Sequence, residues 1–195
     1  MAKAVRPILF VLAVVLLTGC AAKIPHVIVP DYGKQGTRLI AVMPVSNGSS
    51  DPKSAEMLRA KLVDELYFKG YPRIPAKVID EKLAAVAPGA GEKVSPQAIG
   101  KMLKVDAVLY PILSESGMGR GIFTAATAVE ARFELFSAKT GESLWRVQYR
   151  VVERNWGFSR KQVELKSSQV YEPALQKMVD RALETLPDGP DAAGS

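Results

Sequence analysis

Two stretches of alternating side chains, joined by a three-residue turn, constrain the fold of this chain more than any other feature. Apolar residues alternate with charged or polar ones through residues 129–135 and again through 145–151, which is the period of a half-buried strand. The link Lys139-Thr140-Gly141 ends in glycine, as expected of a type I turn followed by a left-handed bulge residue. The sequence therefore predicts an antiparallel hairpin with one buried face and one wet face.

Three separate patterns agree on how this hairpin is paired. The turn decides which residues lie opposite one another, the alternation decides which face is apolar, and the charges on the wet face complement each other across the strands. A slip of one residue would move every apolar side chain to the wet face. The expected core pairs are Leu135–Trp145 and Phe133–Val147, and the expected wet-face pairs are Glu134–Arg146 and Glu130–Arg150.

The first half of the chain alternates between strand and helix signals. The apolar run 39–45 is typical of a strand buried on both faces. Asp51-Pro52 then has the form of a helix N-cap followed by proline, and Gly70 is a stop signal. Such alternation predicts crossover connections and at least one parallel strand pair. The further elements that we expect are a short strand at 71–74, helices after Pro75 and after Ser95-Pro96, and a strand at 105–113.

The last element is an amphipathic helix from about Pro173 to Leu186, whose apolar residues fall on one stripe. Whether residues 159–172 belong to this helix or form a loop stays open. The glycine cluster 117–121 leads into the next strand and not into a helix, so we interpret it as a flexible hairpin loop rather than a phosphate cradle. The expected fold class is α/β (α+β), a mixed sheet with an antiparallel hairpin in its second half and a C-terminal helix.

Leu17-Thr18-Gly19-Cys20 has the form of a lipoprotein cleavage box, and Cys20 is the single cysteine of the 195-residue chain. Two cations, Lys3 and Arg6, precede an apolar run over residues 8–17. This is the layout of a secretory signal, and the run has about half of the ~20 residues that a membrane-spanning helix needs. We expect residues 1–19 to be removed and Cys20 to become the acylated first residue, carrying chains such as palmitate. The alternative is a plain signal peptide beside a chance cysteine.

The order of segments predicts one lipid-anchored domain. Residues 20–37 hold prolines and glycines without a period, as expected of the lipidated cysteine and a tether. Residues 38–186 are expected to form a single domain, and residues 187–195 a disordered tail. Ala21 and Ala22 fit the default sorting class of enteric bacteria, whose members reach the outer membrane. We expect a domain that faces the periplasm, with surface exposure as the open alternative.

Charge and residue types exclude several kinds of function. Without Lys3 and Arg6 the chain keeps 24 cations against 20 acids, a net charge of +4 that is too small and too scattered to indicate nucleic-acid binding. The one histidine, His26, lies in the expected tether, so we expect no histidine-based catalytic site and no histidine–cysteine metal site. Asp64-Glu65 and Asp80-Glu81 are interpreted as solvated helix faces, because neighbouring helical side chains diverge. We therefore expect no enzyme activity, no catalytic residue, no cofactor and no metal.

Trp156 and Phe158, flanked by Arg154 and Arg160, are the candidate binding residues. They follow the last strand in a segment without a clear period. Exposed aromatic residues beside arginine are typical of interface anchors. The alternative is a corner of the chain that folds over the core.

Several segments together resemble a known family of envelope proteins. They are the cleavage box, the strand at 40–47, Gly70-Tyr71 with Pro75, the strand at 105–110 and the hairpin turn at 139–145. In these segments the chain resembles the GNA-type bacterial lipoproteins, a family of unknown function noticed as candidate surface antigens. The resemblance covers about residues 38–186 and implies a domain similar to the amino-terminal domain of TolB and to the curli-export lipoprotein CsgG. Because the chain has no evident pore-forming insertion, a CsgG-like channel is not expected.

The resemblance implies a role, although it defines no catalytic residues that could be carried over. It implies a non-catalytic, protein-binding accessory of an envelope transport or export system, anchored to the outer membrane and able to form a homodimer. The first alternative is a structural or surface-exposed lipoprotein that supports envelope integrity, and the second is a periplasmic enzyme built on carboxylates. The expected partners are the membrane, through the acyl chains, and envelope transport proteins.

Overall fold

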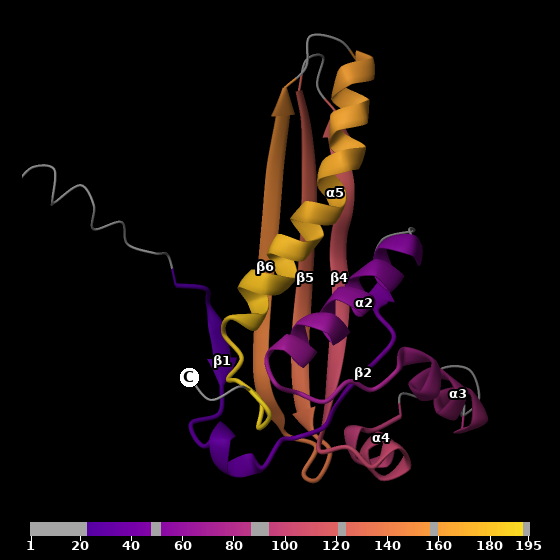
Figure 1. The fold of residues 1–195 in the computed structure, drawn as a ribbon, viewed down its shortest axis with the longest axis vertical. Coiled ribbons are helices and arrows are strands. Elements are labelled where there is room, and N and C mark those ends of the chain that lie inside the picture. Colours follow the sequence, from indigo (N-terminus) through magenta and orange to yellow (C-terminus); the bar gives the residue numbers. More distant parts are fainter. Residues whose placement is uncertain (1–22, 48–51, 87–93, 121–123, 157–159, 193–195) are drawn as a thin grey trace, which may run out of the picture.

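The computed structural model describes residues 23–47, 52–86, 94–120, 124–156 and 160–192. Within them a mixed six-stranded sheet follows the order β1-β6-β5-β4-β2, and β3 also pairs with β4 (Figure 1). The α/β class expected from the sequence is confirmed. The strands are β1 (His26–Ile28), β2 (Ile40–Val42), β3 (Ser46–Asn47), β4 (Ala107–Arg120), β5 (Thr124–Ser137) and β6 (Ser143–Trp156). The helices are the 3₁₀-helix η1 (Tyr32–Gln35), α2 (Pro52–Phe68), α3 (Ala76–Val86), α4 (Pro96–Leu103) and α5 (Arg160–Leu183).

The hairpin of β5 and β6 has the register that the sequence predicts. Leu135 lies opposite Trp145 and Phe133 lies opposite Val147. All four side chains are buried in the core. Gly141 adopts a φ of 80°, so the turn contains the left-handed residue that its sequence predicts.

The wet face of the hairpin keeps one of its two predicted ion pairs. Glu130 lies opposite Arg150, with 3.7 Å between its Oε2 and the arginine Nε. Glu134 lies opposite Arg146 as predicted, but its carboxylate contacts Nη1 of Arg132 at 3.9 Å instead. Residues two apart on one strand share a face, so Arg132 competes for the same acid. Arg146 therefore has no ion-pair partner among the described residues.

Strand β4 runs through the glycine cluster that the sequence indicates as a loop. Gly117 lies opposite Ala128 and Gly119 opposite Ala126, and only Gly121 of the cluster falls outside the described residues. The loop prediction is wrong because pairing with β5 outweighs the weak strand preference of glycine. As a result β4, β5 and β6 each have 14 residues and extend well beyond the short strands (Figure 1).

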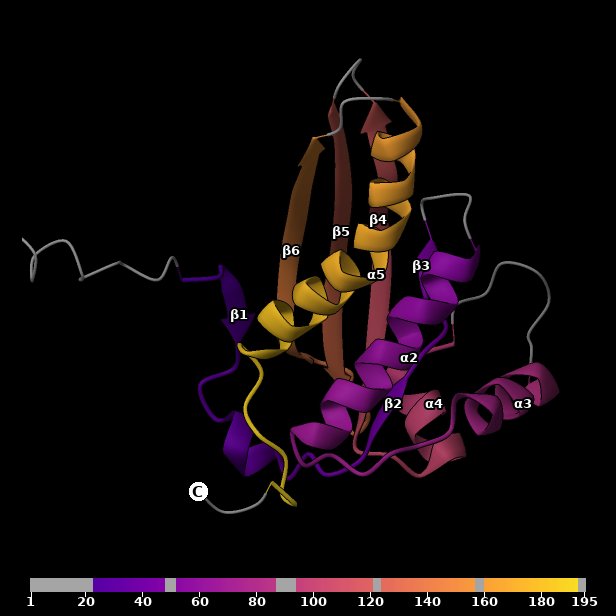
Figure 2. The same cartoon turned by 45° about the horizontal axis from the view of Figure 1, so that its top comes forward.

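Strand β4 also forms the parallel pairs expected in the first half of the chain. β2 pairs with Ala107–Leu109 and β3 pairs with Ile112–Leu113, so the two short strands follow one another along β4 (Figure 2). The single strand expected at 39–45 is interrupted between them. Pro44 lies in this gap and has no N–H to donate to a ladder.

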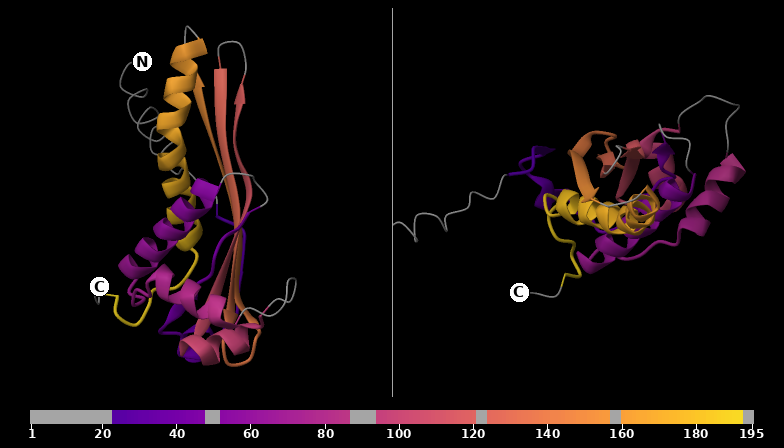
Figure 3. Two further views of the ribbon diagram at one scale, coloured as in Figure 1. Left: turned by 90° about the vertical axis from the view of Figure 1, so that its right-hand side faces the viewer. Right: turned by 90° about the horizontal axis from the view of Figure 1, so that it is seen from above.

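Helices cover the two faces of the sheet unequally (Figure 3). The larger core lies between one face and the helices α2 and α5. The smaller core lies on the opposite face, between the β2–β4 edge and the helices α3 and α4. Most of that opposite face on β5 and β6 carries no helix among the described residues. Its described arginines are exposed, and its acids Glu130 and Glu134 are partly exposed.

Helix α5 begins at Arg160, well before the expected start at Pro173. The open question about residues 159–172 is therefore decided in favour of a helix from Arg160 onward. Pro173 removes one backbone donor inside the helix, and such a proline bends a helix more often than it ends one when tertiary packing holds both halves. The two halves of α5 run in different directions in Figure 1. At its other end the helix stops at Leu183, three residues before the expected end.

Residues 23–37 are part of the domain, which corrects the expectation of a tether. β1 pairs antiparallel with β6, with Val27 opposite Arg146. The side chains of Ile24 and Tyr32 are buried in the larger core. A three-residue strand is too short to show a period in the sequence, so the free edge of β6 decides where this segment lies.

The end of the chain is also held against the domain, which corrects the expectation of a disordered tail for residues 187–192. The N–H of Gly189 donates to the Lys69 carbonyl at 2.7 Å, and Lys69 Nζ lies 2.6 Å from Asp188 Oδ1. The N–H groups of Gly189 and Asp191 satisfy the backbone carbonyls of Lys69 and Gly70, which follow the end of α2. The contacts come from polar residues, which is why composition alone indicates a free tail.

The short strand expected at 71–74 does not form. Tyr71, at the start of this segment, is buried, and its hydroxyl donates to the Pro187 carbonyl at 2.9 Å. Its oxygen also lies 3.0 Å from the hydroxyl oxygen of Tyr32, and burial raises the pKa of both tyrosines. Tyr71 therefore links η1 to the segment that follows α5 by hydrogen bonds of its side chain, instead of adding a strand to the sheet.

Candidate functional site

Cys20, the expected lipidation site, lies outside the described residues, as does the signal segment 1–19. The lipid anchor therefore stays a prediction. The structure does place the chain immediately downstream, because the side chain of Ile24, four residues after Cys20, is buried. Among the described helices, none combines the length and the apolar character that a membrane crossing requires.

Three of the four predicted interface residues come together at one end of the molecule. Arg154 and Trp156 lie at the end of β6, and Arg160 begins α5, at the top of Figure 1. Phe158 lies outside the described residues. Of the four side chains only that of Arg154 is described, and it is exposed. An interface at this end stays a prediction, as does the alternative of a corner folded over the core.

A different set of exposed side chains lies at the C-terminal end of α2. This set, the α2 aromatic patch, consists of Tyr67, Phe68 and Arg73. The two aromatic side chains are 52% and 74% exposed, and their ring centroids lie 6.0 Å apart, edge to face. The Arg73 guanidinium lies 4.7 Å from the centre of the Tyr67 ring, and its Nη2 lies 2.9 Å from Asp64 Oδ1. These contacts order the patch before any partner is present.

The spacing of the apolar residues along α2 indicates which side chains lie outside its buried stripe. Leu58, Leu62 and Leu66 lie four residues apart and are buried, whereas Tyr67 and Phe68 fall outside that stripe. Large aromatic residues beside a buried stripe are exposed only if no other element covers them. The sequence pattern does not show whether another element covers Tyr67 and Phe68, so the patch was not predicted from the sequence.

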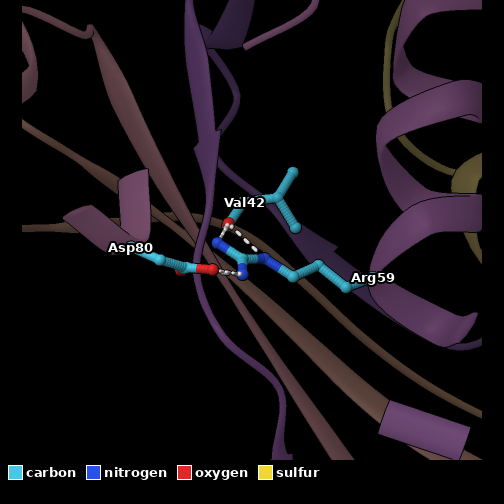
Figure 4. Close-up of polar contacts among 3 residues, drawn as sticks. All are labelled: Val42, Arg59 and Asp80. Atoms are coloured by element: carbon cyan, nitrogen blue, oxygen red, sulfur yellow. Dashed lines mark hydrogen bonds and ion pairs between the residues drawn. The ribbon is translucent and has the colours of Figure 1, made fainter. Parts of the chain in front are cut away.

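Arg59 of α2 reaches the edge of the sheet and the helix on its other face (Figure 4). Its Nε and Nη2 donate to the carbonyl oxygen of Val42 at 3.1 and 3.0 Å. Its Nη1 lies 2.8 Å from both carboxylate oxygens of Asp80, on α3. The neighbours of Val42 on either side bond toward β4, as Met43 N does at 2.9 Å, so the Val42 carbonyl faces the open edge of β2.

Asp80 lies on an exposed helix face, as the sequence predicts, but its carboxylate also accepts hydrogen bonds from Arg59. An edge carbonyl without a strand partner is a template for unwanted pairing, and the guanidinium of Arg59 occupies it. The Asp80 carboxylate, whose side chain is half exposed, balances the charge of the buried Arg59 side chain. The three groups therefore close the β2 edge and join α2 to α3.

Replacing Arg59 with methionine is expected to lower the free energy of unfolding by about 2–4 kcal/mol. The substitution keeps the apolar stem but leaves the Val42 carbonyl and the Asp80 carboxylate without their donor. Urea denaturation measures the change. Lys77→Met is the control, because its exposed pair with Glu81, 3.9 Å apart, contributes little. A midpoint for Arg59→Met equal to that of the control would contradict this role.

The other acids that the sequence singles out lie in separate surroundings. Glu65 accepts a hydrogen bond from Gln176 Nε2 at 2.7 Å, and partial burial together with the Asp180 carboxylate raises the pKa of Glu65. Asp64 and Glu81 pair with different cations, at 2.9 and 3.9 Å. Among the residues that the structure describes, no group of three histidine, cysteine or acidic side chains could hold a metal ion. Asp64, Glu65 and Glu81 therefore bond to different partners.

Comparison with known proteins decides the family. The family model described as "Putative lipoprotein GNA1162-like" matches residues 31–186. The chain belongs to this lipoprotein family. The predicted resemblance to GNA-type lipoproteins is confirmed, and membership associates the protein with the cell envelope.

Individual relatives agree with this assignment. Lipoprotein NMB1124/NMB1162 of Neisseria meningitidis serogroup B is 29% identical over 145 residues, which cover 72% of this chain and 67% of that protein. The crystal structure of lipoprotein GNA1162 from Neisseria meningitidis matches with a TM-score of 0.56 and 25% identity, over 68% of this chain and 94% of that one. A dodecameric PelC from Paraburkholderia phytofirmans matches with a TM-score of 0.50 and 15% identity, over 76% and 86% of the two chains, which shows a shared fold alone. The likeness to TolB and CsgG stays a prediction.

Proposed function

We propose that this protein is a non-catalytic accessory lipoprotein of the bacterial envelope. Acyl chains on Cys20 anchor it to the outer membrane, and its domain faces the periplasm. The α2 aromatic patch binds a protein component of an envelope transport or export system. Family membership supports the lipoprotein assignment, and Ala21 after the cysteine supports the choice of membrane.

The α2 aromatic patch is the observation that carries the proposal. Tyrosine and arginine are enriched at the energetic centres of protein interfaces. Burying the exposed part of a phenylalanine such as Phe68 contributes about 1.5–2 kcal/mol. Because Asp64 and Tyr67 already hold Arg73, little side-chain freedom is lost when a partner binds. A partner surface with an apolar pocket and an acidic rim matches this patch.

A paired substitution in the patch tests the proposal. Tyr67→Ser together with Phe68→Ser is expected to reduce recovery of the partner at least tenfold when the lipoprotein is crosslinked in its native envelope and purified, because two anchors of ~1.5 kcal/mol each are lost. Val78→Ser is the matched control, since Val78 is an exposed apolar residue of α3 outside the patch. The proteins recovered are identified and quantified by mass spectrometry.

The outcome also separates the proposed role from its alternative. A transport or export component that is captured by the wild-type chain and the control, and lost from the double variant, supports both the surface and the role. Equal recovery by all three chains contradicts the patch. Recovery of only peptidoglycan or abundant porins contradicts the transport role and supports a structural role in envelope integrity.

A further inference from the structure

A hollow of about 440 Å³ lies on the outer face of the sheet, where β1, β6 and β5 are neighbours. Arg132 of β5 and Arg146 of β6 line it, together with Gln148, His26 and Val27. Side chains alternate between the faces of a strand, and the neighbours of these arginines point into the larger core. The two guanidinium groups are therefore on the face opposite α2 and α5.

The charged groups of this hollow are cations that lack strong partners. No carboxylate lines the hollow. Arg146 has no ion-pair partner among the described residues, and the pair between Arg132 and Glu134 is long, at 3.9 Å. Guanidinium groups present paired N–H donors that match the oxygens of a phosphate. On this face of β5 and β6 the described charged side chains are the exposed cations Arg132, Arg146, Arg150 and Arg154 and the partly exposed acids Glu130 and Glu134.

The hollow is also close to the expected lipid. His26 and Val27, which line it, follow Cys20 by six and seven residues. The side chain of Ile24 is buried in the domain, and four fully extended residue steps from Cys20 to Ile24 span at most about 14 Å. Acyl chains on Cys20 thus hold Ile24, two residues before β1, within about 14 Å of the lipidated residue.

We propose that the hollow binds the phosphate headgroup of an anionic phospholipid in the leaflet that holds the anchor. Arg132 and Arg146 donate to the phosphate oxygens. The side chain of Val27, which is 58% exposed and lies opposite Arg146, enters the layer between headgroups. This inference rests on the proposed anchor at Cys20.

The orientation that follows agrees with the proposed protein-binding surface. With the outer face of β5 and β6 against the membrane, α2 and α5 lie on the side directed away from it (Figure 3). The α2 aromatic patch is then accessible to a partner. One sheet thus separates a lipid-binding face from a protein-binding face.

Vesicle sedimentation of the unlipidated chain tests the headgroup site. The chain from residue 20 onward with Cys20→Ser contains every described residue and has no acyl chain. At low ionic strength it is expected to sediment with vesicles of phosphatidylcholine and phosphatidylglycerol, and not with phosphatidylcholine alone. Adding Arg132→Gln and Arg146→Gln is expected to lower the partition coefficient roughly 25-fold, since each cation near an anionic surface contributes a factor of about five.

Two further variants separate a built site from general charge attraction. Lys101→Gln with Lys139→Gln removes the same charge from a separate hollow beside the hairpin turn, and is expected to change the partition coefficient less than about threefold. Arg132→Lys with Arg146→Lys keeps the charge but loses the paired donors, and is expected to fall between the wild-type chain and the glutamine pair. Soluble glycerol phosphate at millimolar concentration is expected to leave vesicle binding unchanged.

Three results would overturn the inference. The first is an equal loss of vesicle binding when Arg132 and Arg146, or instead Lys101 and Lys139, are replaced with glutamine. The second is equal binding to both kinds of vesicle. The third is full displacement by glycerol phosphate, which would indicate a site for a free anion. Failure of the anchor itself is detected by a different experiment, the membrane fractionation of lipidated and unlipidated chains. A failed headgroup site and a failed anchor are therefore distinguishable.

Discussion

Replacing Cys20 with serine releases the protein from the membrane, as we expect from the chemistry of the cleavage box. The thiol is the only atom group of the box that accepts diacylglycerol, and Cys20 is the single cysteine of the chain. Each buried methylene contributes about 0.8 kcal/mol, so the loss of two or three acyl chains removes effectively all of the anchoring free energy. Fractionation of cells measures the shift from the membrane pellet to the soluble envelope fraction.

The controls for this substitution follow from the rest of the molecule. A wash in 0.5 M salt screens headgroup attraction at the sheet face, and lipid anchoring resists it. Ala22→Ser, which leaves the thiol in place, is expected to stay in the pellet. Thermal unfolding of the Cys20→Ser chain is expected to match that of the wild-type domain. A washed pellet that still holds the Cys20→Ser chain would show that the anchor is elsewhere.

Trp145→Ala is expected to lower the free energy of unfolding by about 3–5 kcal/mol, the largest effect of any single core substitution proposed for this chain. The Trp145 side chain is fully buried between β5, β6 and α5, where truncation leaves a cavity that the packed strands cannot close. Its Nε1 also donates to Thr185 Oγ1 at 3.0 Å. Because domains are commonly stable by only about 5–15 kcal/mol, this loss brings the fold close to unfolding at 37 °C.

Two companion variants divide this effect into its parts. Trp145→Phe keeps most of the ring and loses the hydrogen bond, so we expect a cost of about 1–2 kcal/mol. Arg146→Ala, the next residue on the exposed face, is expected to change stability by less than about 0.5 kcal/mol. Urea denaturation of the three variants measures these differences. A loss under 1 kcal/mol for Trp145→Ala would contradict the placement of Trp145 at the centre of the core.

The hairpin shows how much a local pattern can determine. Turn chemistry at Gly141, alternation along both strands and the placement of charges all act over a few residues, and together they predict the pairing of Leu135 with Trp145. Helix starts are local in the same way. Ser95 accepts a hydrogen bond from the N–H of Ala98 at 3.2 Å, at the helix start that its sequence indicates. These features were predictable because their causes lie within one element.

The errors share a different physical origin. Segment 26–28 joins the sheet, Gly117 and Gly119 lie within a strand, and residues 187–192 pack against the end of α2. In each case backbone groups form hydrogen bonds that the local pattern does not show. The partners are far away in the sequence for segment 26–28 and residues 187–192, and they lie on the next strand, β5, for the two glycines. Backbone hydrogen bonding does not depend on side-chain type, so composition and period contain little information about it.

The candidate sites also fall into those that contiguous residues define and those that depend on packing between distant segments. The sequence by itself determined the hairpin register and the membership in a lipoprotein family, because each is a property of contiguous residues, and in the same way it predicts a cleavage box at Cys20. Only the tertiary structure decided that residues 23–37 belong to the domain and that the α2 aromatic patch is uncovered. It alone also placed β1 beside Arg146 and so formed the hollow that Arg132 and Arg146 line. Exposure and convergence depend on how distant segments pack, and no local pattern encodes that packing.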